Sequence, residues 1–161
     1  MITPTMVLLI RHGEKPTDIN DSHLSQDGLA RATMLAIEIP RLYPALSSLF
    51  ATAESKHSLR PIETVTPLGI ATGLPVSHTL ADEQYPDLAF ALLDGGYAGQ
   101  TILVCWHHGK IPELARLLGA QDAPMTWDDS DFDHIWQLDY AVDGTVRFSD
   151  RLQPPVTQPE E

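Results

Sequence analysis

The stretch VLLIRHGE, residues 7–14, decides the fold of this chain. Its four apolar residues are β-branched at both ends, which predicts a strand buried on both faces, as in a parallel sheet. The run stops at a cation, an imidazole, a glycine and a carboxylate. Because open α/β sheets bind ligands at the carboxyl ends of their strands, we expect Arg11 and His12 to point into a cleft.

The side chains at this strand end predict a nucleophile beside an anion-binding group. Arg11 offers a rigid fork of donors that matches phosphate or carboxylate. The imidazole of His12 can be neutral, and therefore nucleophilic, near pH 7. Gly13 lets the backbone turn sharply and lets a ligand approach the chain closely.

Arg-His-Gly-Glu after a hydrophobic N-terminal strand resembles the signature of the histidine phosphatase superfamily, the phosphoglycerate mutase-like fold. The resemblance implies an α/β fold, a three-layer sandwich with a mostly parallel central sheet flanked by helices. It covers most of the chain, and we expect a single histidine phosphatase-like domain over residues 1–152. Residues 153–161, which are polar and contain several prolines, are expected to form a disordered tail.

Hydrophobic spacing and turn residues predict the elements between the motifs. Ser25 suits the cap of a helix that ends at Pro40, and Pro61 suits the first turn of the next helix. Asp143-Gly144 predicts a hairpin turn between two C-terminal strands, which we place at one edge of the sheet. The other predicted elements are strands at 49–52, 74–76, 101–106, 134–140 and 145–148 and helices at 60–72, 86–93 and 111–118.

The resemblance implies a second arginine that opens the helix after the second strand and is followed within a few residues by threonine. Arg60-Pro-Ile-Glu-Thr64 matches this pattern. The chain departs from the family upstream, where Ser-Pro often precedes this helix. Thr52 or Ser58 could supply a hydroxyl there, but neither matches that motif.

The resemblance also implies a second histidine after a buried strand, and the strand at 101–106 is followed by two. The family pattern is histidine, two small or polar residues, a variable residue, an aliphatic residue, and arginine or proline. His107 fits, because Ile111 and Pro112 then stand in register. Alignment on His-Gly would select His108 instead and shift those residues by one place. We favour His107 as the catalytic-site histidine and place His108 beside the substrate.

A proton donor for the leaving group is the last implied part of the site, since cleavage of a phosphate monoester benefits from protonation of the leaving oxygen. In single-domain members the acid is often a carboxylate after the third strand, in a Leu-x-Glu context. Leu80-Ala-Asp-Glu offers Asp82 in register and Glu83 next to it, and both stay open. Glu14 and Lys15 border the cleft, where a role in substrate binding and a plain loop role are equally open.

Together these residues imply a phosphomonoesterase that works through a phosphohistidine on a small phosphorylated substrate. His12, Arg11, Arg60, His107 and one acidic residue would carry the chemistry, with substrate contacts from Gly13, Glu14, Lys15 and His108. A phosphoglycerate mutase-type transfer and a non-catalytic anion-binding protein are the alternatives. No cofactor or metal is expected, because His12, His107 and His108 lack a nearby cysteine or carboxylate ligand pattern.

Composition limits the partners and the compartment. A formal net charge of -12 argues against nucleic acid or an anionic membrane surface as the main partner. No run approaches the ~20 apolar residues of a membrane span. The N-terminus lacks a basic segment, so it does not read as a signal peptide, and the single cysteine, Cys105, cannot form an internal disulfide. We therefore expect a cytoplasmic protein, and the sequence leaves its oligomeric state open.

Overall fold

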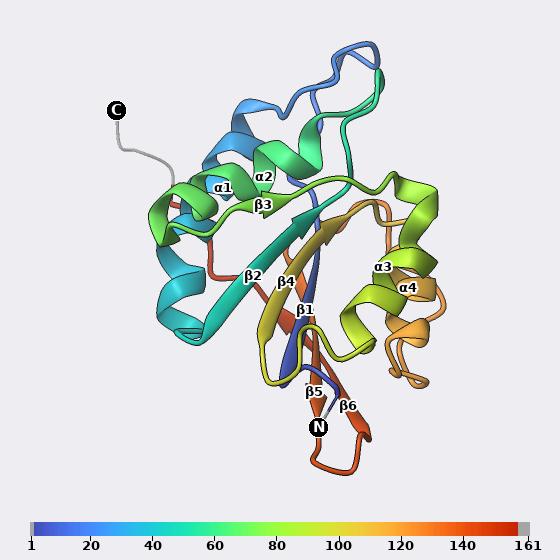
Figure 1. Ribbon diagram of the computed structural model, residues 1–161. Coiled ribbons are helices and arrows are strands. Elements are labelled where there is room, and N and C mark those ends of the chain that lie inside the picture. Colours follow the sequence, from blue (N-terminus) through green and yellow to red (C-terminus); the bar gives the residue numbers. More distant parts are fainter. Residues whose placement is uncertain (1, 158–161) are drawn as a thin grey trace.

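The computed structural model describes residues 2–157 and contains one six-stranded sheet with helices on both faces (Figure 1). The four α-helices are α1 (Gln26–Leu42), α2 (Arg60–Thr72), α3 (Tyr85–Leu93) and α4 (Ile111–Leu117), with a 3-10 turn η1 (Asp82–Gln84) before α3. The strands are β1 (Met6–Arg11), β2 (Leu46–Ala51), β3 (Val76–Ser77), β4 (Thr101–Trp106), β5 (His134–Tyr140) and β6 (Val146–Leu152).

The sheet has the strand order β3-β2-β4-β1-β5-β6. The first four strands are parallel, while β5 pairs antiparallel with β1 and β6 antiparallel with β5. This confirms the predicted mostly parallel sheet with a C-terminal hairpin at its edge. Arg11 is level with Trp106 in the register of β1 and β4, so His12 and His107 leave the sheet at the same height.

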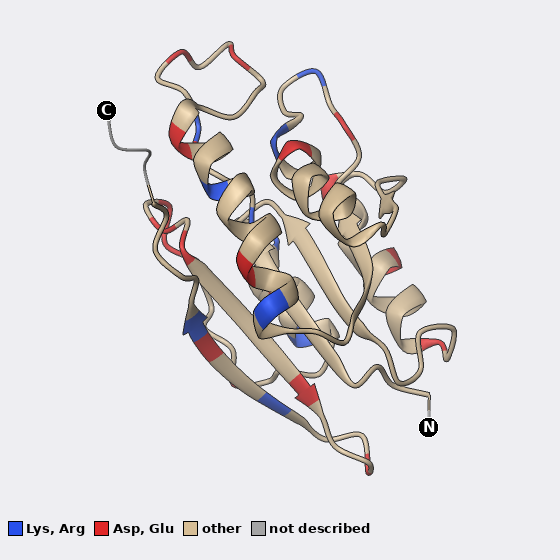
Figure 2. Ribbon diagram, turned by 90° about the vertical axis from the view of Figure 1, so that its left-hand side faces the viewer, with Lys and Arg blue, Asp and Glu red and all other residues tan. Residues whose placement is uncertain are grey.

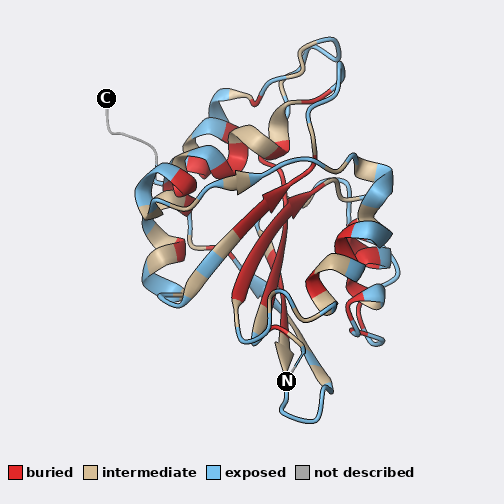
Figure 3. Ribbon diagram, viewed as in Figure 1, coloured by how far each residue is buried: buried red, intermediate tan, exposed pale blue. Residues whose placement is uncertain are grey.

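Alternation along the central strands explains their continuous apolar runs. In β1, Val7 and Leu9 pack toward α3 and α4, whereas Leu8 and Ile10 pack toward α1 and α2. All four side chains are fully buried, and β4 is buried along its whole length (Figure 3). The strand is therefore apolar on both faces because helices cover both faces.

Several element boundaries differ from the sequence prediction, among them the start of β2, which lies at Leu46 rather than Leu49. Helix α1 passes Pro40 and ends at Leu42, because a proline in the last turn removes only one hydrogen bond near the helix end. Strand β3 has only two residues. Strand β6 extends to Leu152, because it pairs with β5 along its full length. The pattern of β6 does not show this, since residues 149–151 are polar and residues 150–152 are exposed.

The stretch 153–161, which we expect to form a disordered tail, is anchored at its first residue. Gln153 is buried, and its side-chain oxygen accepts a hydrogen bond from Arg31 Nη1 at 2.9 Å. Its backbone N–H donates to the carbonyl of Asp133 at 2.7 Å. Residue 153 thus ties the C-terminal strand to α1, while residues 158–161 lie outside the described residues.

Positively charged residues are few in this protein, and they are not evenly distributed over it. Lysine and arginine are sparse along the ribbon, as the net charge of -12 requires (Figure 2). Two of the arginines, Arg11 and Arg60, nevertheless lie at the carboxyl end of the parallel strands, where they concentrate positive charge. Within residues 2–157, no helix combines the length and the hydropathy needed to cross a membrane.

Candidate active site

The carboxyl ends of β1 and β4 bring the two predicted histidines together. The ring centroids of His12 and His107 lie 5.2 Å apart, with the ring planes at 71°. The backbone N–H of His12 donates to the carbonyl of Trp106 at 3.2 Å, which continues the strand pairing up to the site. Parallel pairing therefore fixes the distance between two residues that are far apart in the sequence.

The local contacts of His12 leave one ring nitrogen with a free lone pair. Its Nδ1 lies 2.7 Å from the carbonyl oxygen of Gly13. A carbonyl oxygen only accepts, so Nδ1 carries the proton and Nε2 the lone pair. Burial, together with the positive charges of His107 and Arg11, lowers the pKa of His12 to about 3. The ring is thus neutral near pH 7, as a nucleophile requires.

His107 and His108 have different surroundings. Burial lowers the pKa of His107 to about 4, and the charges of Arg60, His108 and Arg11 act in the same direction. His108 is more exposed, and its Nε2 lies 3.6 Å from the carboxylate of Asp129. This geometry favours His107 over His108 as the partner of His12.

The guanidinium of Arg11 is fully buried at the end of β1. Its Nη1 donates to the carbonyls of Asp129 at 2.6 Å and Asp131 at 3.2 Å, and its Cζ lies 3.9 Å from the ring centroid of Phe132. Its Nε and Nη2 have no hydrogen-bond partner among the described residues. Loop 129–132 therefore holds one side of the guanidinium and leaves the other side free to donate.

Arg60 is the first residue of α2, where Pro61 occupies the first turn. Its Nη1 donates to the carbonyl of Asp21 at 2.8 Å, and its buried Nε has no partner among the described residues. Its charge lowers the pKa of both His12 and His107, as the charge of Arg11 does, so both guanidinium groups act on the same two imidazoles.

Buried polar atoms without a partner gather at this end of the sheet. Buried polar groups are normally hydrogen-bonded, so each exception needs a reason. Among residues 2–157, seven buried side-chain atoms lack a partner, and only Thr3 Oγ1 and Ser149 Oγ belong to other regions. The five at the site are Arg11 Nε, Arg11 Nη2, Thr52 Oγ1, Arg60 Nε and Asp82 Oδ1. Three of the five are guanidinium donors, which suit an anion.

The two candidate acids differ in burial. Asp82 begins η1, and its Oδ1 is buried without a partner among the described residues. Burial raises the pKa of Asp82, and the neighbouring charge of Glu83 raises it further, while Lys110 opposes the shift. Glu83 is exposed. The geometry favours Asp82, since burial favours the protonated form that a general acid needs.

The residues after His12 have separate roles. The N–H of Gly13 donates to Thr64 Oγ1 at 2.9 Å, and a Cβ at this glycine would lie 3.1 Å from the backbone of Gly28. Glu14 is held by the guanidinium of Arg31, with oxygen-to-nitrogen distances of 2.8 and 2.9 Å. Glu14 therefore ties its loop to α1, and this bidentate pairing gives it a structural role. Lys15 is exposed and borders a groove.

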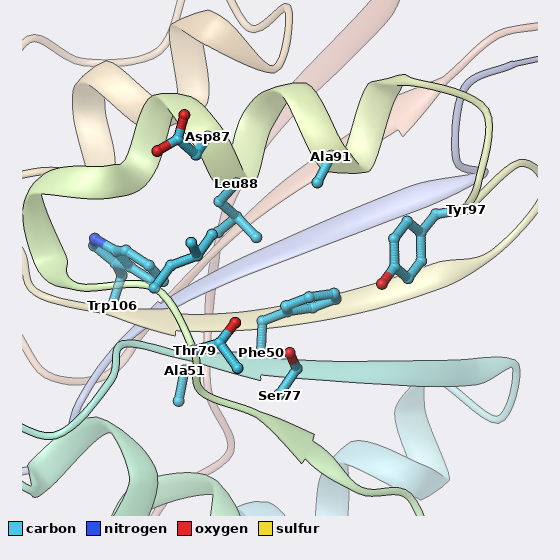
Figure 4. Close-up of a pocket in the computed structure, with 10 residues that line it drawn as sticks. Phe50, Ala51, Ser77, Thr79, Asp87, Leu88, Ala91, Tyr97 and Trp106 are labelled. Carbon is cyan, nitrogen blue, oxygen red and sulfur yellow. The ribbon is translucent and has the colours of Figure 1, made fainter.

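That groove has a volume of about 700 Å³. Its walls come from residues 14–17, residues 25–27, Asp129 and Phe132, and the ring centroid of Phe132 lies 6.2 Å from that of His12. Asp129 and Phe132, which contact Arg11, form part of the lining. A second cavity of about 310 Å³ lies between α3 and the sheet (Figure 4).

Sequence reasoning did not assign a role to Thr64 by itself or to the residues that cover Arg11. Thr64 Oγ1 accepts from Gly13 and donates to the carbonyl of Arg60 at 2.7 Å, which links the two strand-end motifs. The spacing Arg60-x-x-x-Thr64 is the signal for it. Asp129 and Phe132 lie in an acidic loop without a recognisable motif.

One histidine-carboxylate group has the spacing of metal ligands. Single ligand atoms of Asp131, Asp133 and His134 all lie within 4.8 Å of one another. The other ring nitrogen of His134 lies 2.7 Å from the carboxylate of Asp150. Ion pairs within the group account for this arrangement, so we assign no metal to it.

Comparison of the sequence alone finds no relative: no family model and no curated protein matches it. Comparison of the structure does find relatives. The protein histidine phosphatase SixA complexed with tungstate is 16% identical, covers 91% of this chain and 96% of its own, and has a TM-score of 0.62. Phosphoglycerate mutase from Plasmodium falciparum is 14% identical, with 97% of each chain covered and a TM-score of 0.60.

The chain has the histidine phosphatase fold. A mycobacterial glucosyl-3-phosphoglycerate phosphatase agrees, at 15% identity, a TM-score of 0.56 and coverage of 92% of this chain and 97% of its own. The resemblance seen in the sequence is thereby confirmed at the level of the fold. These histidine phosphatase-fold proteins span the full length of the sheet and its helices, so the cluster around His12 occupies the carboxyl end of a shared scaffold.

Proposed function

We propose that this protein is a metal-independent phosphomonoesterase that acts through a phosphohistidine on His12. The observation that carries the proposal is the pairing of a neutral imidazole with guanidinium nitrogens that have no hydrogen-bond partner within residues 2–157. A phosphoryl group has three peripheral oxygens that need such donors. The phosphatases among the structural neighbours support the same reading.

The first step is transfer of the phosphoryl group to His12. The lone pair of Nε2 forms the N–P bond in line as the P–O bond to the leaving group breaks. The electron pair moves to the leaving oxygen, which takes a proton from Asp82. The hydrogen bond from Nδ1 to the carbonyl of Gly13 stabilises the positive ring that forms.

The second step returns the enzyme to its starting state. Asp82, now a carboxylate, takes a proton from water as the water oxygen attacks phosphorus. The N–P bond breaks, its electron pair returns to Nε2, and inorganic phosphate leaves. Arg11, Arg60 and His107 bind the peripheral oxygens in both steps and offset the charge that builds up there. The two guanidinium groups supply the positive charge that this chemistry needs.

The leaving group would extend toward the groove beside Lys15. The net charge of -12 disfavours large polyanionic substrates, whereas the buried arginines favour a single phosphoryl group. A small phosphorylated molecule is therefore the substrate class that we propose.

Turnover of a panel of phosphate monoesters by the purified protein tests this function. We expect release of inorganic phosphate without added metal and in the presence of a chelator. His12→Asn retains a donor for the Gly13 carbonyl but has no nucleophilic ring nitrogen, so it should lose activity by at least about 10³-fold. Wild-type turnover by His12→Asn would reject the mechanism, and inactivity of the wild type on the whole panel would reject the function.

A further inference from the structure

The indole of Trp106 makes a hydrogen bond that the proposed mechanism does not yet use. Trp106 is the last residue of β4, directly before His107, and only 1% of it is exposed. Its Nε1–H donates to the backbone carbonyl of Asp82 at 3.0 Å. The strand that presents one site histidine thus also holds the residue that we propose as the acid.

The loop before α3 has few other ties at this point. The backbone N–H of Ala53 donates to the carbonyl of Leu80 at 2.7 Å, and Gln84 Oε1 accepts from the N–H of Ala81 at 2.9 Å. The Asp82 side-chain oxygen Oδ1 has no partner among the described residues. The position of the Asp82 carboxyl is therefore set through its backbone, and the indole bond acts at that residue.

One face of the indole borders a cavity. Figure 4 shows Trp106 at one end of the cavity and Tyr97 at the other, with Leu88 and Ala91 of α3 above and Phe50 below. This cavity has a volume of about 310 Å³. The cavity leaves space on that side of the ring, and the hydrogen bond is the polar contact that joins the indole to the loop.

We propose that Trp106 is a positioning residue that aligns the Asp82 carboxyl with the leaving group by holding the Asp82 carbonyl. This inference rests on the proposed function. Alignment matters because a displacement of about 1 Å can lower the rate of a positioned group about 10²-fold. The need for an acid depends on the leaving group: an alkoxide must be protonated as it leaves, whereas p-nitrophenolate is stable without a proton.

The experiment compares Trp106→Phe with the wild type on two esters, p-nitrophenyl phosphate and glycerol 2-phosphate. We expect kcat on glycerol 2-phosphate to fall about 10- to 100-fold, within the range that general acids contribute. On p-nitrophenyl phosphate kcat should stay within about 3-fold, and tungstate affinity should be unchanged.

Trp136→Phe is the matched control. Trp136 is also buried, belongs to the same apolar cluster and makes no indole hydrogen bond to any residue from 2 to 157. We expect it to leave the activity ratio of the two esters unchanged. In an Asp82→Asn background, Trp106→Phe should have no further effect on that ratio, because both changes act through one acid.

The outcomes separate this inference from the proposed function. An active wild type whose Trp106→Phe variant loses both activities equally would overturn the positioning role alone. A wild type that is inactive on the whole panel of phosphate monoesters would overturn the function and, with it, this inference. If Trp106→Phe does not fold, benzothienylalanine at position 106 keeps the ring shape without the N–H donor, and the same change in ratio is expected.

Discussion

Acid should destabilise this protein through His12, because the folded state holds that imidazole neutral. Burial lowers the pKa of His12 to about 3 in the folded protein, against 6.5 for a free side chain. Between these values the unfolded chain binds a proton at this residue that the folded protein does not bind. The contribution of His12 to stability is therefore complete above about pH 6.5 and is lost as the pH falls toward 3.

The size of this effect follows from the difference between the pKa of His12 in the folded protein and in the unfolded chain. Each pH unit below 6.5 favours unfolding by about 1.4 kcal/mol for one proton. At about pH 4.5, still above the folded pKa, His12 should have lowered the free energy of unfolding by about 2.7 kcal/mol. This is a large part of the roughly 5–15 kcal/mol that stabilises most domains.

Urea unfolding at pH 7 and pH 4.5 measures the effect, with His12→Asn as the control. Asn has no group that titrates in this range, and its amide can donate to the carbonyl that His12 contacts. The wild type should lose about 2.7 kcal/mol more than His12→Asn between the two pH values. Equal losses in the two proteins would refute a neutral, buried His12.

Two further substitutions test the loops that surround the site. Asp129→Asn removes a carboxylate that is 82% exposed and lies 3.6 Å from both Arg11 Nη2 and His108 Nε2. Calorimetry should therefore show tungstate binding up to about 5-fold more tightly. Weaker or unchanged binding would contradict an anion site at Arg11. Gly28→Ala would place a Cβ 2.6 Å from a backbone carbonyl oxygen, so it should lower the free energy of unfolding by about 1–3 kcal/mol. Gly109→Ala is the control, because its Cβ would meet no atom within 4 Å. Equal stability of the two variants would show that the close approach at Gly28 is absent.

The fold could be predicted from the sequence where its signals are local. The strand at 101–106 was predicted with the observed bounds, because an uninterrupted apolar run can be buried only at the centre of the sheet. The sequence does not mark the end of β6, because residues 149–151 are polar and the strand lies on an exposed edge, where alternation is weak. Their pairing with β5 is a long-range effect that local patterns do not show.

The site residues also fall into those that local sequence signals predict and those that long-range contacts place. Arg11, His12 and His107 follow directly from strand ends, and the pairing of β1 with β4 places the two histidines together. The contacts of Arg11 with loop 129–132 join residues about 120 positions apart, and no motif marks that loop. The sequence leaves a substrate role and a loop role of Glu14 equally open, and its pairing with a buried arginine of α1, which the sequence does not single out, favours the loop role.

The central claim is that one imidazole at the end of β1 is phosphorylated during turnover. The most direct measurement is rapid quenching of wild-type protein with a ³²P-labelled aryl phosphate, followed by peptide mapping. We predict a label on His12 that is stable in alkali and lost in acid, and that is absent from His12→Asn. Steady hydrolysis without any labelled protein at the shortest times, or a label that maps to another residue, would contradict the account.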